Sequence, residues 1–255
     1  MSSLVLSGVG FVGSAVMSAL SHEYTIYVSD PLINNKKVFD FESAEGAILC
    51  LPTPEKEDGS CDLSYIDKVL SECYHNIPIL IKSTMSLEGF RFLRNKYSLL
   101  SITFSPEFLT AKNAKEDFKN QKIMYFAGDN TDFWSSIFYK AMPHLQISTH
   151  SDIETLILAK YFRNSFLALK VAYANQMFDV CEKLNISFEE LINIFRQDPR
   201  IGDSHTTVPG DDGRGFGGAC FPKDTAALLY SMKHYGIDFS ILKEAVKYNN
   251  SIKEL

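Results

Sequence analysis

One cysteine lies in a setting that could make it a nucleophile. Cys220 follows the most glycine-dense stretch of the chain, Gly210–Gly218, and precedes a helical pattern from Thr225 to His234. Because Pro222 suits the first turn of a helix, we place Cys220 at a helix N-terminus beside Lys223, a positive setting that stabilises a thiolate. Asp224 follows one turn later on the same side. This combination is typical of covalent catalysis by a thiol.

The other cysteines are expected to behave as small buried side chains. The five cysteines form an odd set without a C-x-x-C pair, which disfavours a disulfide framework and a cysteine zinc site. The six histidines have no metal-ligand spacing, so we expect no bound metal. The four cysteines outside the glycine-rich loop are Cys50, Cys61, Cys73 and Cys181.

A lysine and an asparagine form a second candidate pair. Residues 152–183 contain no proline or glycine and predict one long helix, opened by Ser151 or Asp152 as N-cap. Lys160 and Asn164 interrupt an apolar stripe of this helix one turn apart, so both side chains could enter one pocket. The alternative is that Lys160 reaches solvent and Asn164 caps a neighbouring element. Since the adjoining face is also apolar, we expect the helix to be buried broadly.

The N-terminus carries a dinucleotide fingerprint in the expected context. Leu4–Ser7 predicts a strand, a glycine turn and a helical pattern follow, and a second strand at Thr25–Ser29 ends at Asp30. The glycines permit a tight turn, close approach of a pyrophosphate and helix packing, while Asp30 favours NAD over NADP because a carboxylate repels a 2′-phosphate. The loop residues expected to contact the cofactor are Gly8, Val9, Gly10, Phe11, Val12 and Gly13.

Further strands extend this unit. Apolar runs at 47–51, 77–81 and 99–103 alternate with amphipathic stretches at 63–74 and 87–97, which predicts an α/β, Rossmann-like doubly wound parallel sheet. Ligands bind beyond the carboxyl ends of such strands. The segments placed there are Pro52-Thr53-Pro54, Lys82-Ser83-Thr84 and Ser105-Pro106-Glu107-Phe108-Leu109.

Length and composition set the frame for these elements. The 255 residues, 45% of them hydrophobic, suffice for one or two globular domains, and the pattern changes near residue 150. The net charge of −6 disfavours a nucleic-acid partner. No apolar run is long enough to span a membrane and the first residues lack the basic flank of a signal peptide, so we expect a cytoplasmic protein.

Taken together, the fingerprint and the run from Gly215 to Asp224 resemble the UDP-glucose/GDP-mannose dehydrogenase family. The resemblance covers nearly the whole chain and includes Arg200-Ile201-Gly202. It implies a Rossmann-like NAD-binding domain over 1–150 and an all-α central dimerisation domain over 151–255 with one long helix. It also implies that a nucleotide sugar, with UDP-glucose favoured, is oxidised from the C6 alcohol to the carboxylate in two hydride transfers to NAD.

The resemblance also implies roles for individual residues. Cys220 attacks the intermediate aldehyde to give a thiohemiacetal and then a thioester, and Lys160 and Asn164 stabilise the oxyanion. Asp224 orients or deprotonates water or Lys160. The residues expected to position the hydrolytic water are Glu107 and Thr84. Those expected to contact cofactor are Pro52, Thr53, Ser83, Thr84 and Lys223, and those expected to contact substrate are Glu107, Phe108, Leu109, Lys160, Asn164, Phe216 and Gly217, with Arg200 reaching the substrate of a partner subunit in a homodimer.

The chain departs from the family pattern at three points. Met85-Ser86 replaces the usual Val-Pro, Ala111 replaces an acidic residue, and the third, nucleotide-covering domain is missing after Leu255. Either another chain supplies that domain, or nucleotide recognition is weakened, or the chain is a fragment. Two other interpretations stay open: a β-hydroxyacid dehydrogenase, which needs no cysteine, and a non-catalytic NAD-binding partner of a full-length enzyme.

Overall fold

The structure, a computed structural model, describes residues 2–34, 43–72, 77–110, 112–211 and 213–253. Cys73 and Ala111, both considered above, lie outside the described residues. The strands are β1 (Ser3–Ser7), β2 (Thr25–Ser29), β3 (Gly46–Leu49), β4 (Ile79–Ile81), β5 (Ile102–Phe104), β6 (Ile123–Gly128) and β7 (Gln146–His150). The helices are α1 (Phe11–Leu20), α2 (Ser64–Ser71), α3 (Leu87–Lys96), α4 (Ala114–Asn120), α5 (Thr131–Ala141), α6 (Ile153–Leu184), α7 (Phe188–Arg196), α8 (Phe221–His234) and α9 (Ser240–Lys253). None of these helices combines the length and the apolar character needed to cross a bilayer.

The strands form one seven-stranded sheet of order β2-β1-β3-β4-β5-β6-β7. The predicted α/β fold is therefore confirmed, and the first five strands pair in parallel. Two strands that the sequence did not predict extend the sheet: β6 runs antiparallel to β5, and β7 is parallel to β6. The region from α4 to β7 was not assigned elements from the sequence. The carboxyl ends of β1, β3, β4 and β5 still meet at one edge, where the predicted ligand segments begin.

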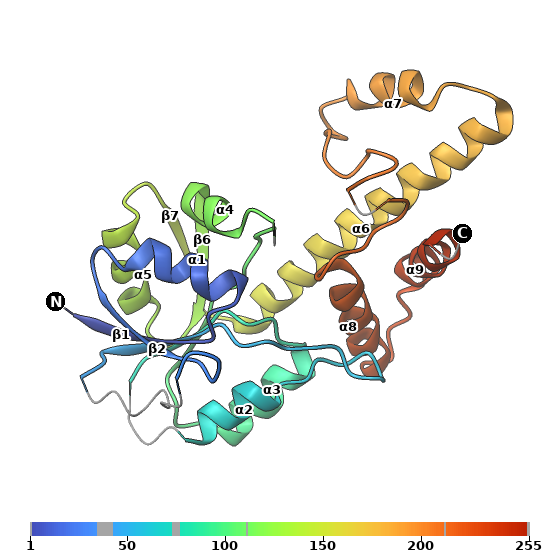
Figure 1. Cartoon of the computed structure of the whole chain (residues 1–255). Helices are drawn as coiled ribbons and strands as arrows, with labels where there is room; N and C mark the ends of the chain where they lie inside the picture. The colour runs from blue at the N-terminus through green and yellow to red at the C-terminus, as the bar shows by residue number, and fades with distance from the viewer. Residues whose placement is uncertain (1, 35–42, 73–76, 111, 212, 254–255) are drawn as a thin grey trace. The chain divides into compact units, whose positions relative to one another are not determined.

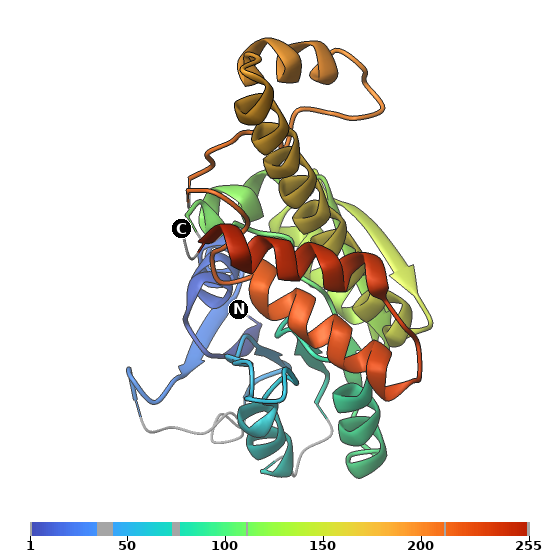
Figure 2. The ribbon, with the colours of Figure 1, turned by 90° about the vertical axis from the view of Figure 1, so that its right-hand side faces the viewer.

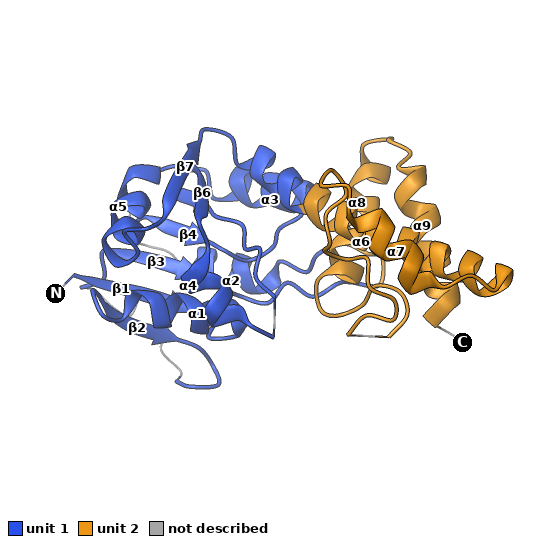
Figure 3. Cartoon of the chain, turned by 90° about the horizontal axis from the view of Figure 1, so that it is seen from above, with its two compact units in different colours: residues 1–56, 61–160 blue, residues 57–60, 161–255 orange. Residues whose placement is uncertain are grey.

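The chain divides into two compact units (Figure 3). Unit 1 comprises residues 1–56 and 61–160, and unit 2 comprises residues 57–60 and 161–255. In unit 1, helices α1, α4 and α5 cover one face of the sheet and α2 and α3 cover the other (Figure 1). The main core lies under α1, α4 and α5, and its largest fully buried side chains are Trp134, Phe118, Phe126 and Phe138.

Unit 2 is helical. Helices α8 and α9 lie side by side (Figure 2), and a small apolar core joins α6 to the loop before α8 and to α9. Its buried members are Ala168 and Ala172 of α6 and Phe216 of the loop. Because these alanines are small, the loop packs closely against α6, and this packing fixes one end of the glycine-rich segment.

The long helix α6 begins and ends within one residue of its predicted limits. The carboxylate of Asp152 accepts hydrogen bonds from the backbone N–H groups of Glu154 and Thr155, at 2.9 and 3.2 Å, as an N-cap does. The expectation of broad burial is wrong for the second face, because Phe162, Phe166 and other large side chains of α6 are exposed. Sequence periodicity shows an apolar face but not what covers it.

Candidate active site

The glycine loop between β1 and α1 is shaped by two close approaches and one open position. Gly8 has φ +85°, and a side chain there would lie 2.5 Å from the carbonyl oxygen of Cys50. A side chain at Gly13 would collide with the carbonyl oxygen of Gly8. At Gly10, by contrast, a methyl group would meet no atom within 4 Å. Gly10 also caps α1 without a side chain, so the first N–H groups of the helix are open to an anion.

Asp30 holds this loop from the end of β2. Its Oδ2 accepts a hydrogen bond from the N–H of Val9 at 2.8 Å, and its Oδ1 accepts one from the N–H of Leu32 at 2.9 Å. Each oxygen keeps a further lone pair for a ligand hydroxyl. In the loop, Phe11 is exposed and Val12 is partly buried against the core.

The segment after β4 connects several predicted site residues. Ser83 is buried, and its Oγ accepts a hydrogen bond from the N–H of Leu51, which fixes the loop after β3. Thr84 Oγ1 accepts a hydrogen bond from Lys160 Nζ at 2.6 Å. Lys160 is 8% exposed, so the alternative that its ammonium reaches solvent freely does not hold. A threonine and a lysine that are 76 positions apart in sequence thus share one hydrogen bond.

Glu107 follows β5 and is paired with a lysine. Its Oε1 forms an ion pair with Lys82 Nζ, and both side chains are buried, at 5% and 0% exposed. Lys82 Nζ also donates a hydrogen bond to Ser105 Oγ at 3.0 Å. The sequence predicts Lys82 only as part of a cofactor-lining segment, without a role of its own. A sequence feature that could have revealed this pairing is the position of Lys82, a lysine directly after a buried apolar strand.

The remaining predicted positions of unit 1 have simpler environments. Phe108 packs edge to face against Tyr125, with ring centroids 6.2 Å apart, and Leu109 packs against the main core. Thr53 is buried, whereas Pro52 is exposed. The cofactor and substrate roles of these residues stay predictions.

The predicted nucleophile begins α8. Cys220 is the N-cap residue of this helix and is exposed to solvent, and Pro222 lies in the first turn. Lys223 Nζ lies 3.3 Å from Asp224 Oδ1, and Asn164 Nδ2 donates to Asp224 Oδ2 at 2.6 Å. Asp224 is 1% exposed, so the amide from α6 and the ammonium from α8 stabilise a buried carboxylate one turn from the thiol. Asn164 therefore fixes α8 through Asp224.

The other described cysteines differ from Cys220. Cys61 and Cys181 are buried and Cys50 is partly buried. Burial raises the pKa of the Cys50 thiol to about 12, with smaller opposing effects of Lys82 and Glu107. Within the described residues no cluster of histidine, cysteine and carboxylate side chains is arranged to hold a metal ion.

The loop that precedes Cys220 is held by two asparagines that the sequence analysis missed. Asn249 of α9 accepts from the N–H of Phe216 at 2.6 Å and donates to its carbonyl oxygen at 3.1 Å. Asn175 of α6 accepts from the N–H of Gly215 at 3.1 Å. Phe216 is 3% exposed, and Gly217 follows it. A side-chain amide that pairs with both backbone groups of one residue fixes the loop at that point.

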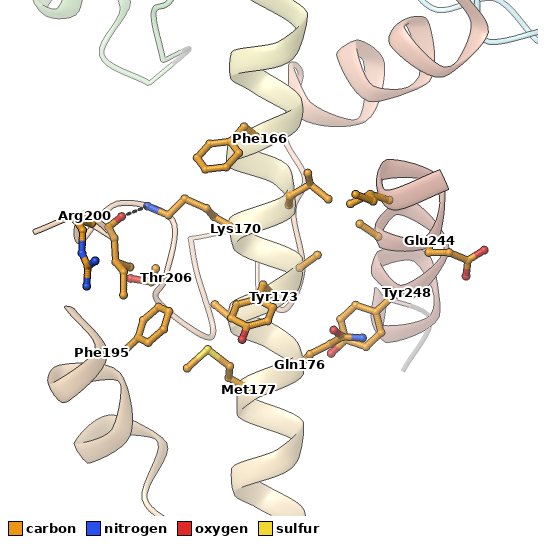
Figure 4. Close-up of a pocket in the computed structure, with 16 residues that line it drawn as sticks. Phe166, Lys170, Tyr173, Gln176, Met177, Phe195, Arg200, Thr206, Glu244 and Tyr248 are labelled. Carbon is orange, nitrogen blue, oxygen red and sulfur yellow. Dashed lines mark hydrogen bonds between the residues drawn. The ribbon is translucent and has the colours of Figure 1, made fainter. Parts of the chain in front are cut away.

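Arg200 lies outside these contacts. Its guanidinium pairs with Asp198, and its side chain is 88% exposed. It borders a cavity of about 650 Å³ beside α6, whose other lining residues include Phe166, Tyr173 and Tyr248 (Figure 4). Lys170 Nζ, on the same helix, donates to the carbonyl oxygen of Ile201 at 3.0 Å and so fixes the loop that carries Arg200.

Comparison with known proteins identifies the helical unit. Residues 154–251 match the UDP-glucose/GDP-mannose dehydrogenase family, central domain. The chain carries the central domain of this family. The match includes Lys160, Asn164, Cys220 and Asp224.

Individual relatives agree with this assignment. The chain is 34% identical over 221 residues to a UDP-glucose 6-dehydrogenase of Rickettsia felis, a match that covers 82% of the chain and 48% of the relative. It is 29% identical to the UDP-glucose 6-dehydrogenase YwqF of Bacillus subtilis, over 82% of the chain and 49% of that protein. The chain thus spans about half the length of the curated relatives it matches.

Solved structures share the fold. A UDP-glucose dehydrogenase of Pyrobaculum islandicum superposes with a TM-score of 0.81 at 23% identity, over 98% of this chain and 68% of that one. A 3-hydroxyisobutyrate dehydrogenase of Mycobacterium tuberculosis superposes with a TM-score of 0.76 at 17% identity, over 97% of this chain and 92% of that one. The fold alone therefore does not separate the two kinds of dehydrogenase.

Proposed function

We propose that the chain acts as an NAD-dependent nucleotide-sugar dehydrogenase that oxidises the C6 alcohol of UDP-glucose to the carboxylate. The observation that supports this most is Cys220, an exposed thiol at the N-terminus of α8, one turn from the buried Asp224. A double oxidation needs a covalent intermediate, and a thiol at a helix N-terminus can form one. UDP-glucose is the first choice because the curated relatives cited above are named UDP-glucose 6-dehydrogenases.

The glycine loop fits NAD. The open position at Gly10 and the free N–H groups of α1 accommodate a pyrophosphate, and Asp30 keeps lone pairs for ribose hydroxyls. NAD held there by the glycine loop and Asp30 would supply the hydride acceptor for the two oxidations. Pro52, Thr53, Ser83 and Lys223 remain candidates for further cofactor contacts.

The first oxidation would pass a hydride from C6 to the cofactor held at the glycine loop and release the hydroxyl proton to water, giving an aldehyde. The Cys220 sulfur then bonds to the aldehyde carbon, and the carbonyl oxygen becomes the oxygen of a thiohemiacetal. Lys160 and Asn164 stabilise the negative charge that develops on this oxygen. Thr84 supports the role of Lys160, because its hydroxyl holds the ammonium at 2.6 Å.

The second oxidation removes the remaining C6 hydride and leaves a thioester on Cys220. Water then attacks the thioester carbon, the carbon–sulfur bond breaks, and the carboxylate product leaves as the sulfur regains its thiolate form. In this proposal Glu107 and Thr84 position that water, and Asp224 orients Asn164 and Lys223. Glu107, Phe108, Leu109, Phe216 and Gly217 are the candidates for sugar contacts.

We further propose that two copies of the chain associate through α6. Phe166 and Tyr173 are 62% and 59% exposed on this helix, beside the cavity that Arg200 borders. Large apolar side chains that are exposed together on one helix face are typical of a protein interface. A second copy would cover them and bring its Arg200 to the neighbouring active site. A further chain that supplies the nucleotide-covering domain is a second candidate partner.

Sedimentation tests the dimer. Phe166→Asp with Tyr173→Asp places two charges on the α6 face and is expected to give a monomer, because an unpaired charge in a buried interface costs several kcal/mol. Leu99→Asp, at a residue of unit 1 that is 92% exposed, is the control and should leave the mass unchanged. A dimer that persists in the α6 variant would place the interface elsewhere.

A β-hydroxyacid dehydrogenase is the second candidate function. It is favoured by one observation, the match over 92% of the Mycobacterium tuberculosis 3-hydroxyisobutyrate dehydrogenase chain. Such an enzyme performs one hydride transfer and leaves Cys220 without a task. The two functions therefore differ in how many NADH form per substrate.

The decisive experiment counts NADH per sugar consumed. The purified chain is mixed with NAD and limiting UDP-glucose, with UDP-N-acetylmannosamine, GDP-mannose and 3-hydroxyisobutyrate in parallel reactions. Two NADH per UDP-glucose, together with loss of the double oxidation in Cys220→Ser, is the expected result. Cys61→Ser serves as the matched control at a buried thiol.

Other outcomes are equally informative. One NADH from 3-hydroxyisobutyrate and none from the sugars would establish the second candidate. NAD binding without turnover on any substrate would indicate a non-catalytic partner of a full-length enzyme.

A further inference from the structure

Among the described charged residues of unit 1, Lys82 is the most deeply buried. Its side chain is fully buried, and its Nζ lies 5.7 Å from the ring centroids of both Phe118 and Phe138. Aromatic faces attract a cation, but they do not replace a counter-charge. A buried ammonium in an apolar setting is stable only when a carboxylate pairs with it.

Glu107 supplies that counter-charge. Its Oε1 forms an ion pair with Lys82 Nζ, its own side chain is 5% exposed, and Ser105 Oγ accepts a hydrogen bond from the ammonium. The two ionic side chains come from the ends of the adjacent strands β4 and β5, which run parallel and so end at the same edge of the sheet. Lys82 directly follows β4 and Glu107 lies three residues after β5, so the pair lies at this edge of the sheet.

We propose that Lys82 is a positioning residue that holds Glu107 as a buried carboxylate anion. This inference rests on the proposed function, in which Glu107 positions the water that cleaves the Cys220 thioester. Only the anion can accept the proton of that water while the oxygen bonds to the thioester carbon and the sulfur leaves. Without Lys82, burial would favour the neutral acid, which cannot accept a proton.

A thiol, two aromatic rings and a hydroxyl lie near the pair. Cys50 faces both side chains from the end of β3, and burial raises the pKa of its thiol to about 12, so it stays neutral. Phe118 of α4 and Phe138 of α5 do not titrate, and Ser105 contributes a neutral hydroxyl. Lys82 is thus the cation that the Glu107 carboxylate contacts.

The first test needs no substrate and compares Lys82→Met, Glu107→Gln and the double variant by urea unfolding at several pH values. In Lys82→Met, the lone Glu107 binds a proton more tightly folded than unfolded, so stability falls as the pH rises. In Glu107→Gln, the lone Lys82 binds its proton less tightly folded than unfolded, so stability falls as the pH drops. The double variant should show neither slope.

The expected size is large. At neutral pH, each single variant should raise the unfolding equilibrium constant by about a hundredfold or more, because one buried charge is left unpaired. The control, Lys140→Met, removes an exposed lysine that pairs with Glu23 at 3.1 Å and should change the constant by less than about fivefold. Equal slopes in all variants, or none, would overturn the proposal.

The second test follows the intermediate. With NAD and UDP-glucose, Lys82→Met should form the thioester on Cys220 at nearly the wild-type rate but hydrolyse it at least about a hundredfold more slowly, seen by mass spectrometry of the intact chain. Lower pH should slow this hydrolysis further, which a packing defect would not do. Wild-type hydrolysis in a folded variant with the expected pH slope would overturn the positioning role.

The two tests distinguish a failure of the proposed function from a failure of the proposed role of Lys82. If the wild-type chain oxidises no sugar, the proposed function fails, while opposite pH slopes in the single variants would still support Lys82 as the group that keeps Glu107 ionised.

Discussion

The loop before Cys220 depends on one asparagine, and its removal should loosen the loop without unfolding the chain. Asn249 is 3% exposed and satisfies both the N–H and the carbonyl group of Phe216, at 2.6 and 3.1 Å. In Asn249→Ala both backbone groups remain buried and unpaired. Each unpaired group costs about 1–3 kcal/mol, so we expect the closed loop to lose about 3 kcal/mol relative to an open one.

Hydrogen exchange at the Phe216 amide measures this change. A loss of about 3 kcal/mol corresponds to roughly a hundredfold increase in the opening equilibrium and in the exchange rate. Asn249→Asp keeps an oxygen that can accept from the Phe216 N–H and should give a smaller increase. Asn250→Ala, at the exposed neighbour on α9, is the matched control and should leave the rate unchanged.

The result that would refute this reasoning is an unchanged exchange rate at Phe216 in Asn249→Ala. An equal acceleration in Asn250→Ala would also refute it, because the effect would then belong to α9 as a whole. In turnover, Asn249→Ala should raise the KM for the nucleotide sugar more than it lowers kcat, since Phe216 and Gly217 are proposed to contact substrate.

Three further outcomes follow from the structure. Gly10→Ala should leave the unfolding free energy unchanged but weaken NAD binding at least about tenfold, measured by calorimetry, whereas Gly13→Ala should destabilise unit 1 because its side chain would collide with backbone. At mildly alkaline pH, iodoacetamide should label Cys220 but not Cys50, whose pKa is about 12, and peptide mass spectrometry that finds Cys50 labelled first would contradict this. Burial, followed by a hydrogen bond to a carboxylate, raises the pKa of Tyr248 from 10.0 to about 12, so its stabilising effect is complete below pH 10 and is lost as the pH rises through 12. Tyr248→Phe should therefore flatten the alkaline fall of stability in urea unfolding, and an unchanged fall would be inconsistent with the raised pKa.

Much of the fold could be predicted from local sequence patterns. The alternation of strands, glycine turn and helices in the first hundred residues predicted β1 to β5, and the absence of proline and glycine predicted α6. Caps could be read equally well: Asp152 and Pro222 mark the starts of α6 and α8. These features are encoded within a few residues of where they act.

Other features depend on contacts between distant segments and were not predicted. The direction of β6 is one, because an apolar run does not state whether it pairs parallel or antiparallel. The pairing of Lys82 with Glu107 is another, since it is created by the adjacency of β4 and β5. The exposed face of α6 is a third, because periodicity reports apolar character and not the partner that covers it.

The glycine fingerprint separates into positions kept for different reasons. Backbone at Cys50 and Gly8 leaves no room for side chains at Gly8 and Gly13, so we expect the fold to require both glycines whether or not a cofactor binds. Gly10 faces open space, and only a ligand would select against a larger residue there. In related chains with this fold, we therefore expect replacement of Gly10 to accompany loss of the proposed cofactor, whereas Gly8 and Gly13 would be kept for the backbone packing alone.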